Sequence, residues 1–243
     1  MGKRKSVMDI QFNDDVVVEL VKESAGDAEV AYSARVSTEG QRSLVFSKHE
    51  DEIGGLINFL MRERHGSPFE HSSFTFYVKA PIFVWREHMR HRIASYNEES
   101  GRYKVLEPEF YIPSRERKLV QVGKTGEYSF EDGTDTQYAI ITASIMSASR
   151  NAYQGYLNML EAGVAKEVAR MALPVNIYSS AYVTMNARAL MNFLSLRQSA
   201  EGSHFPSYPQ REIEMVAEKY EKFFADQMPL TYKAFIDNGR VSP

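Results

Sequence analysis

The chain has 243 residues, is 43% hydrophobic and 25% charged, carries a net charge of -3 and contains no cysteine. This composition suits one or two globular domains and excludes disordered, collagen-like and coiled-coil chains, and the weak acidic balance argues against a dedicated nucleic-acid binder. Without cysteine there is no disulfide, no Cys-ligated zinc, no iron–sulfur cluster and no thiolate nucleophile.

The first part of the chain predicts strands and helices in alternation. Its start, Met1–Lys5, is basic but has no apolar stretch behind it, so we expect no signal peptide and residence in the cytoplasm. No apolar run approaches the ~18 residues of a membrane span. Hydrophobic spacing and breaker residues predict a strand at 16–21, a helix at 28–36 with Asp27 as N-cap, a helix at 51–64, a strand at 74–80 and, opened by Pro81, a helix at 82–92.

The second part is richer in helix. Polar residues predict a loop at 97–101. Pro108, Pro113 and the segment 122–135 predict irregular structure, with a hairpin near 124–126. Further on, the pattern predicts helices at 136–162 and 165–173, a strand at 177–185, a helix capped by Asn186 and ending near 198, a loop at 199–209 and a helix at 210–227. No linker or repeat divides the chain, so we predict one α+β domain over residues 1–243, with a mainly antiparallel sheet flanked by long helices.

Several common motifs are absent. Gly123-Lys124-Thr125 resembles the end of a phosphate-binding P-loop, but Lys118 stands where that motif needs glycine, so a loop tip is the better interpretation. The sequence has no G-x-G-x-x-G and no G-x-S-x-G. His65 and His71 lack a helical metal-ligand spacing, so we expect no metal site.

The segment Arg90-His91-Arg92 is the first strong functional signal. On a helix its side chains fan out over about 200°, so they cannot share one solvated face. Cations at a helix C-terminus favour the helix dipole, which is the alternative structural explanation. The polar loop that follows supports a ligand site instead, because arginines bind phosphate and Gly101 lets a ligand approach the backbone. The set suits a phosphorylated, hydrogen-bonding ligand such as a nucleotide.

The spacing carries a family resemblance. Arg90-His91-Arg92, seven residues, then Ser100-Gly101-Arg102 matches R-H-R-x7-S-x-R, the signature of the flavin-dependent thymidylate synthases, at every fixed position. The resemblance extends from roughly Ala28 to Ile213 and includes the block from Arg64 to His71 and the block from Val183 to Arg197.

The resemblance implies methylation of dUMP to dTMP without a cysteine nucleophile. In this family methylenetetrahydrofolate supplies the carbon, NADPH supplies the electrons and FAD carries the hydride. The family works as a homotetramer with active sites shared among subunits. It implies nucleotide, folate and NADPH as partners and neither nucleic acid nor membrane.

The resemblance also assigns flavin contacts. Arg90, His91 and Arg92 are placed against the flavin, and Glu98 lies between flavin and nucleotide. The other flavin positions that it implies are Ser67, Asn186, Ala187, Arg188, Asn192, His65 and His204. Asn186 is also explained as an N-cap, and His65 equally well as a loop histidine.

The nucleotide is implied to lie along Glu87, His88, Met89 and Arg90 and along Glu98, Glu99, Ser100, Gly101 and Arg102. Arg170 resembles a phosphate-contacting arginine, and Arg197 resembles the catalytic arginine that stabilises negative charge on the pyrimidine. Ser100 is assigned to uracil positioning because no His–Asp pair is evident nearby to activate it. The chain departs from the family where Glu87 replaces a frequent glutamine and where the loop at 199–209 is longer, which affects the alignment of His204.

Two other hypotheses stay open. The first is a nucleic-acid-binding module that uses the cations Arg86, Arg90, Arg92, Arg102 and Lys104. Three acids stand among them, Glu87, Glu98 and Glu99, and they reduce the local charge from five to two, which opposes binding to a phosphate backbone. A catalytically inactive homologue retained for assembly is opposed by the intact signature.

Overall fold

The computed structural model describes residues 6–42, 50–124 and 127–243. The chain forms two compact units, each made of segments that are distant in sequence. The first unit is built from the described residues of 1–15, 80–85 and 99–179, and the second from those of 16–79, 86–98 and 180–243. The chain passes repeatedly between the units, so neither is a continuous stretch of sequence. The single domain over residues 1–243 stays a prediction.

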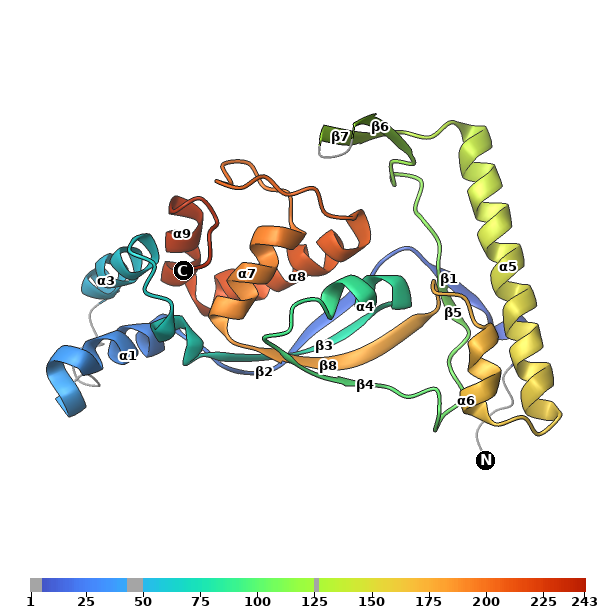
Figure 1. The fold of residues 1–243 in the computed structure, drawn as a ribbon, viewed down its shortest axis with the longest axis horizontal. Coiled ribbons are helices and arrows are strands. Elements are labelled where there is room, and N and C mark those ends of the chain that lie inside the picture. Colours follow the sequence, from blue (N-terminus) through green and yellow to red (C-terminus); the bar gives the residue numbers. More distant parts are fainter. Residues whose placement is uncertain (1–5, 43–49, 125–126) are drawn as a thin grey trace. The chain divides into compact units, whose positions relative to one another are not determined.

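The first unit is organised around the long helix α5 (Asp135–Glu161), uninterrupted in Figure 1. A capping box starts it: Gln137 N donates to Thr134 Oγ1 at 3.2 Å, and Thr134 N donates to Gln137 Oε1 at 2.8 Å. Tyr153 and Tyr156 anchor its buried side through hydrogen bonds with the backbone of Leu106. The other elements are η1 (Val7–Asp9), β1 (Gln11–Asn13), β5 (Glu109–Tyr111), the β6 (Val120–Lys124) and β7 (Glu127–Glu131) hairpin, α6 (Lys166–Ala169) and η4 (Arg170–Ala172).

The second unit holds most of a four-stranded sheet in the order β2 (Val17–Ser24), β3 (Ser73–Pro81), β8 (Tyr178–Met185), β4 (Ser95–Glu98). The β2–β3 and β4–β8 pairs are antiparallel. Its helices are α1 (Asp27–Glu39), η2 (Gly40–Arg42), α3 (Glu50–Arg62), η3 (Ser67–Glu70), α7 (Ala187–Arg197), α8 (Arg211–Gln227) and α9 (Pro229–Asp237), and α4 (Ile82–His88) ends in it. This arrangement confirms the α+β class.

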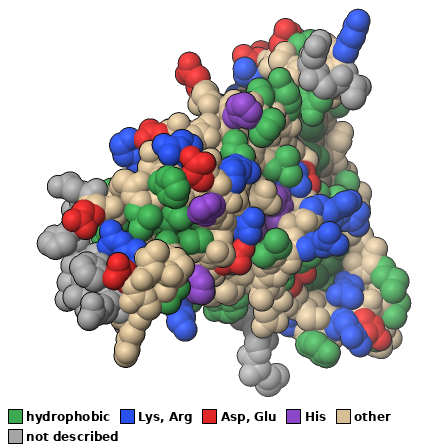
Figure 2. All heavy atoms as spheres, turned by 60° about the vertical axis from the view of Figure 1, so that its left-hand side comes forward, with side chains coloured by type: hydrophobic (Ala, Val, Ile, Leu, Met, Phe, Trp, Pro, Cys, Tyr) green, Lys and Arg blue, Asp and Glu red, His purple; other side chains and the backbone are tan. Residues whose placement is uncertain are grey.

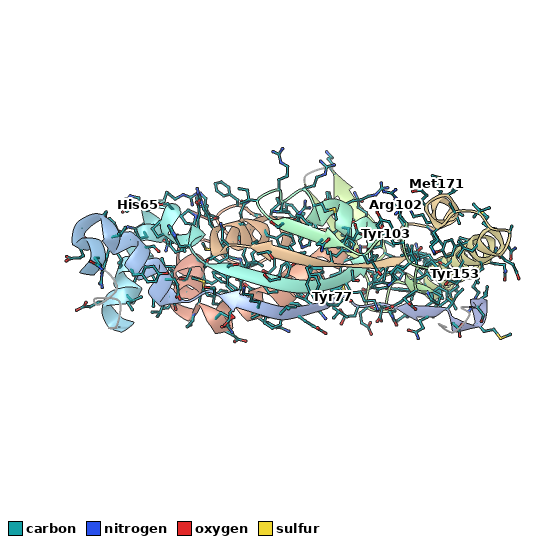
Figure 3. The ribbon with its side chains drawn as sticks, turned by 90° about the horizontal axis from the view of Figure 1, so that it is seen from below. His65, Tyr77, Arg102, Tyr103, Tyr153 and Met171 are labelled. Atoms are coloured by element: carbon teal, nitrogen blue, oxygen red, sulfur yellow. The ribbon has the colours of Figure 1, made fainter. Side chains whose placement is uncertain are left out.

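The two faces of this sheet differ. Alternation along β3 buries Phe74, Phe76 and Val78, and the ring of Phe76 packs 4.4 Å from that of Tyr220 in α8. Figure 1 shows α7 and α8 on the same side of the sheet. The opposite face carries Tyr77, labelled in Figure 3, in an edge contact with Tyr182, which is 50% exposed.

Four local predictions need correction. The helix predicted at 82–92 ends at His88, and the loop predicted at 97–101 begins inside β4. The helix predicted at 165–173 is divided into α6 and η4. Gly26, not Asp27, precedes α1, and the Asp27 carboxylate instead accepts hydrogen bonds from the first amides of α9, a helix that the sequence pattern missed. The hairpin near 124–126 is confirmed by the β6–β7 pairing, although its turn lies outside the described residues.

Within the described ranges, no helix is long and apolar enough to cross a membrane. The same residues contain no group of three or more His, Asp or Glu side chains that could hold a metal ion.

Candidate functional site

The signature arginines lie in a turn between α4 and β4. After α4 ends, Arg90 N donates to Glu87 O at 3.2 Å and His91 N donates to His88 O at 3.1 Å. This turn places Arg90 and Arg92 on the surface, where neither side chain forms a hydrogen bond or ion pair with any residue that the structure describes. Two unpaired guanidinium groups on one short turn suit an anionic ligand. They follow the last residue of α4, where the helix dipole also favours cations, so the dipole explanation and the ligand interpretation are compatible.

Arg197 lies beside this turn, at the last residue of α7. Its Nη1 donates to Glu87 Oε2 at 2.8 Å, its Nη2 to Glu87 O at 3.2 Å and its Nε to His91 Nε2 at 3.0 Å. Its side chain is 15% exposed. The resemblance implies only that Arg197 and the signature act on the same nucleotide, and the structure brings Arg197 into contact with His91 and Glu87. Arg197 is therefore a partly buried cation whose own guanidinium donors fix it against the turn.

Electrostatics around Arg197 follow from burial. Desolvation raises the pKa of the Glu87 carboxyl, and the charge of Arg197 opposes that rise. Burial and then the charge of Arg197 lower the pKa of His91 to about 4. His91 is therefore neutral near pH 7, and its Nε2 accepts from Arg197 while Nδ1 carries the proton.

His88, which the resemblance assigned to the nucleotide, is 1% exposed. Its ring contacts Tyr96, Tyr220 and Phe193. Burial is the largest cause that lowers the pKa of His88 to about 3. Met89 is 38% exposed and follows it in the turn.

The buried histidines predict acid sensitivity of the fold. In the unfolded chain His88 and His91 would titrate near pH 6.5, whereas their folded pKa values are about 3 and about 4. The contribution of these two histidines to the free energy of unfolding should therefore be fully present above about pH 6.5. It should be lost as the pH decreases toward 4, because only the unfolded chain takes up these protons in that range. Urea unfolding between pH 7.5 and 5 measures this, and His88→Asn should make the decline shallower. A stability that does not change over this range would contradict the assignment.

The implied flavin contacts form a second cluster in the same unit. The Ala187 N–H at the start of α7 donates to Ser72 Oγ at 2.9 Å, and Asn186 Oδ1 accepts from Ala189 N at 2.9 Å. The N-cap interpretation of Asn186 is thus confirmed, and its contact with phosphate stays a prediction. Arg188 Nη1 donates to Glu70 Oε1 at 2.5 Å, so the two sequence blocks of the resemblance meet here.

Arg188 packs directly against the backbone of Gly66, where a side chain would leave no room for it. A Cβ at Gly66 would lie 2.5 Å from Arg188 Cζ and 2.8 Å from Pro243 O. Arg188 Nε donates to that same carbonyl oxygen at 2.6 Å. Glycine is therefore needed for the close approach of Arg188 and the backbone at Pro243. Sequence reasoning missed Gly66, Glu70 and Pro243, and only the first two lie in a block that it singled out.

The other implied flavin residues occupy more open positions. Ser67, Asn192 and His204 are exposed. The His65 ring, labelled in Figure 3, makes an edge contact with Phe59. The backbone of His204 is fixed because its N–H donates to Gly239 O at 2.9 Å.

In the first unit, Ser100 opens a turn. Its Oγ accepts from Arg102 N at 3.3 Å, and Arg102 Nε donates to Glu167 Oε2 at 2.8 Å. Gly101 is buried, and a Cβ there would lie 3.1 Å from both Arg170 Cδ and Leu106 Cδ1. Gly101 thus serves internal packing, which corrects the expectation that it admits a ligand. Arg170 is exposed, and its side chain has no ion pair or hydrogen bond within the described chain.

The implied nucleotide residues thus belong to both units. Glu87, His88, Met89, Arg90, Glu98 and Arg197 lie in the second, whereas Glu99, Ser100, Gly101, Arg102 and Arg170 lie in the first. Glu98 ends β4 and Glu99 forms an ion pair with Lys104 at 2.7 Å.

Comparison with known proteins gives consistent matches. Residues 19–230 match the family described as thymidylate synthase complementing protein. Flavin-dependent thymidylate synthases from Tropheryma whipplei (strain TW08/27) and Streptomyces avermitilis are 57% and 58% identical, over 98% and 96% of this chain and 99% and 95% of theirs. The crystal structure of the UMP/dUMP methylase PolB from Streptomyces cacaoi bound with 5-Br dUMP has a TM-score of 0.92 and 48% identity, covering 96% of this chain and 100% of that one.

Proposed function

This chain belongs to the flavin-dependent thymidylate synthase family, and from that premise we propose that it converts dUMP to dTMP by reductive methylation. Methylenetetrahydrofolate would supply the carbon, NADPH the electrons and FAD the redox cofactor, in the cytoplasm. The observation that carries the proposal is the cation of Arg197, fixed against Glu87 and His91 beside the turn of Arg90 and Arg92. The absence of cysteine fits this route, because without a thiolate nucleophile the pyrimidine ring must be activated by nearby charge.

The donor set fits FAD. The exposed guanidinium groups of Arg90 and Arg92, together with Arg188 at the start of α7, suit a pyrophosphate. We assign Ser67, His65, His91, Glu98, Asn186, Ala187, Asn192 and His204 to the same cofactor site. Bound FAD would supply the hydride chemistry, and the protein would supply binding and orientation.

The nucleotide roles follow from charge. Arg197 stays protonated and would stabilise negative charge on the pyrimidine, while the Glu87 carboxylate and His91 orient its guanidinium. In the first unit, Arg102 and Arg170 would bind phosphate and Ser100 would position uracil. Met89, Glu98 and Glu99 complete the proposed nucleotide site.

The assembly proposed is a homotetramer with shared active sites. Its support is the first part of α5, where the apolar residues between Tyr138 and Ser149 are not buried within the chain and Ile140 is 61% exposed. Ile93, in the signature turn, is 74% exposed. Large exposed apolar side chains favour a covering partner. Light scattering during gel filtration would give the mass, and a monomer would oppose this assembly.

Nucleic acid and membrane are not among the partners that we propose. Among the described residues in Figure 2, basic side chains are interspersed with acidic ones. A phosphate backbone would favour a continuous basic stripe. The other partners would be dUMP, folate and NADPH.

A second candidate substrate is UMP. The similarity to a protein described as a UMP/dUMP methylase favours testing it. Parallel assays with dUMP and UMP would rank the two nucleotides.

The colour of the purified protein tests the cofactor directly. We expect a yellow protein whose flavin absorbance bleaches on addition of NADPH and dUMP. A colourless preparation that also fails to take up added FAD would exclude the flavin site.

A further inference from the structure

We propose that Tyr96, held by His88 and Tyr220, is a positioning residue that fixes the turn carrying Arg90 and Arg92. The ligand-binding part of this inference rests on the proposed function. The hydrogen-bond network itself does not.

The network links four parts of the second unit. Tyr220 of α8 has its hydroxyl 2.9 Å from His88 Nε2, and His88 Nδ1 lies 3.2 Å from the hydroxyl of Tyr96 in β4. The Tyr96 hydroxyl also donates to the carbonyl oxygens of His91 at 2.9 Å and His88 at 3.1 Å. Both carbonyls belong to the turn that closes after α4.

Counting protons assigns each donor. Tyr96 has one hydroxyl proton, and carbonyl oxygens can only accept, so that proton goes to the turn. His88 Nδ1 must then carry a proton and donate to the Tyr96 oxygen, while Nε2 accepts from Tyr220. The opposite tautomer would leave the proton of the buried Tyr220 hydroxyl without an acceptor, which costs stability.

Burial keeps these protonation states. It raises the pKa of Tyr96 to about 12 and that of Tyr220 well above its ordinary value, so both hydroxyls remain donors. The ring of Phe193 packs against His88 and against His91, with centroids 4.8 Å and 4.6 Å apart. These contacts, together with the burial of His88 and Tyr220, keep water away from the His88 imidazole.

The consequence concerns the signature turn. His91 is held twice, because Tyr96 binds its carbonyl oxygen and Arg197 binds its imidazole. Arg90 and Arg92 flank His91, and no hydrogen bond or ion pair with the described residues holds their side chains. Their direction therefore depends on the backbone that Tyr96 fixes. Pre-organisation of this kind reduces the entropy lost when a ligand binds.

The test compares Tyr96→Phe with Tyr77→Phe. Tyr77 lies on the opposite face of the same sheet, and its hydroxyl has no hydrogen bond to a described residue, so it is a matched control. We expect Tyr96→Phe to weaken FAD binding and raise the KM for dUMP about tenfold, with a smaller change in kcat. Hydrogen–deuterium exchange should accelerate over residues 89–94 in Tyr96→Phe alone.

The histidine supplies a readout independent of ligands. Nitrogen NMR of the wild-type protein should show His88 protonated on Nδ1 and unprotonated on Nε2. His88→Asn, whose amide can still donate toward Tyr96, should protect the turn better than His88→Leu. A proton on Nε2, equal exchange in Tyr96→Phe and Tyr77→Phe, or equal ligand binding in those two variants would overturn the inference. If the wild-type protein bound neither flavin nor dUMP, the proposed function would fail, while the NMR and exchange results would still decide this one.

Discussion

Replacing Arg197 with alanine should abolish most dTMP formation while the protein remains folded and retains bound flavin. Arg197 is the cation that Glu87 and His91 hold beside the signature turn, with contacts of 2.8 and 3.0 Å. Removal of one preorganised donor to developing negative charge usually lowers kcat about 10²–10³-fold. The measurement is dTMP formation at saturating dUMP, with flavin absorbance and circular dichroism recorded on the same sample.

Two controls define this result. Arg211→Ala removes an arginine of α8 that pairs with Glu218 at 2.5 Å, and it should leave turnover almost unchanged. Arg197→Lys keeps the charge but loses the fork that binds Glu87 and His91, so its activity should be intermediate. Near-normal turnover of Arg197→Ala would show that the pyrimidine is activated elsewhere.

Gly66→Ala should sharply weaken flavin binding. The new Cβ would lie 2.5 Å from Arg188 Cζ and 2.8 Å from the backbone oxygen of Pro243, so at least one of them must move. Gly66 has φ -77, a conformation that alanine adopts freely, so the effect is steric. Loss of a charged hydrogen bond to the cofactor predicts a dissociation constant raised about tenfold or more. Fluorescence titration with FAD measures it.

Gly55→Ala is the matched control for this substitution. Gly55 lies within α3, and a Cβ there would have no neighbour within 4 Å, so flavin affinity should stay unchanged and helix stability should rise slightly. Wild-type affinity in Gly66→Ala would mean that Arg188 does not contact the flavin or that the loop adjusts without cost.

The sequence was sufficient to predict the regular parts of the fold. Helical periodicity located α5 and α8, and alternation located β3 with Phe74, Phe76 and Val78 on its buried side. These elements are encoded locally, because each has a long apolar pattern. The arginine signature is also visible in the sequence, and the family resemblance implies that Arg197 acts on the pyrimidine of the nucleotide that the signature contacts.

The errors came from contacts between distant residues. Asp27 has the side chain of an N-cap, but it caps α9 across about 200 positions of sequence, as its bond to Thr231 N shows. β4 is polar and resembles a loop, yet pairing with β8 makes it a strand with Tyr96 directed toward His88. Gly101 fits a ligand-binding loop by type, whereas its surroundings are Arg170 and Leu106. No local pattern distinguishes these cases.

Product analysis tests the central claim most directly. The FAD-loaded protein is mixed with dUMP, isotopically labelled methylenetetrahydrofolate and NADPH, and the nucleotides are separated by chromatography. We expect labelled dTMP to form in proportion to the NADPH that is oxidised, with Arg197→Ala as the inactive control. Flavin that is bound and reduced by NADPH while dUMP is recovered unchanged would contradict the proposed function.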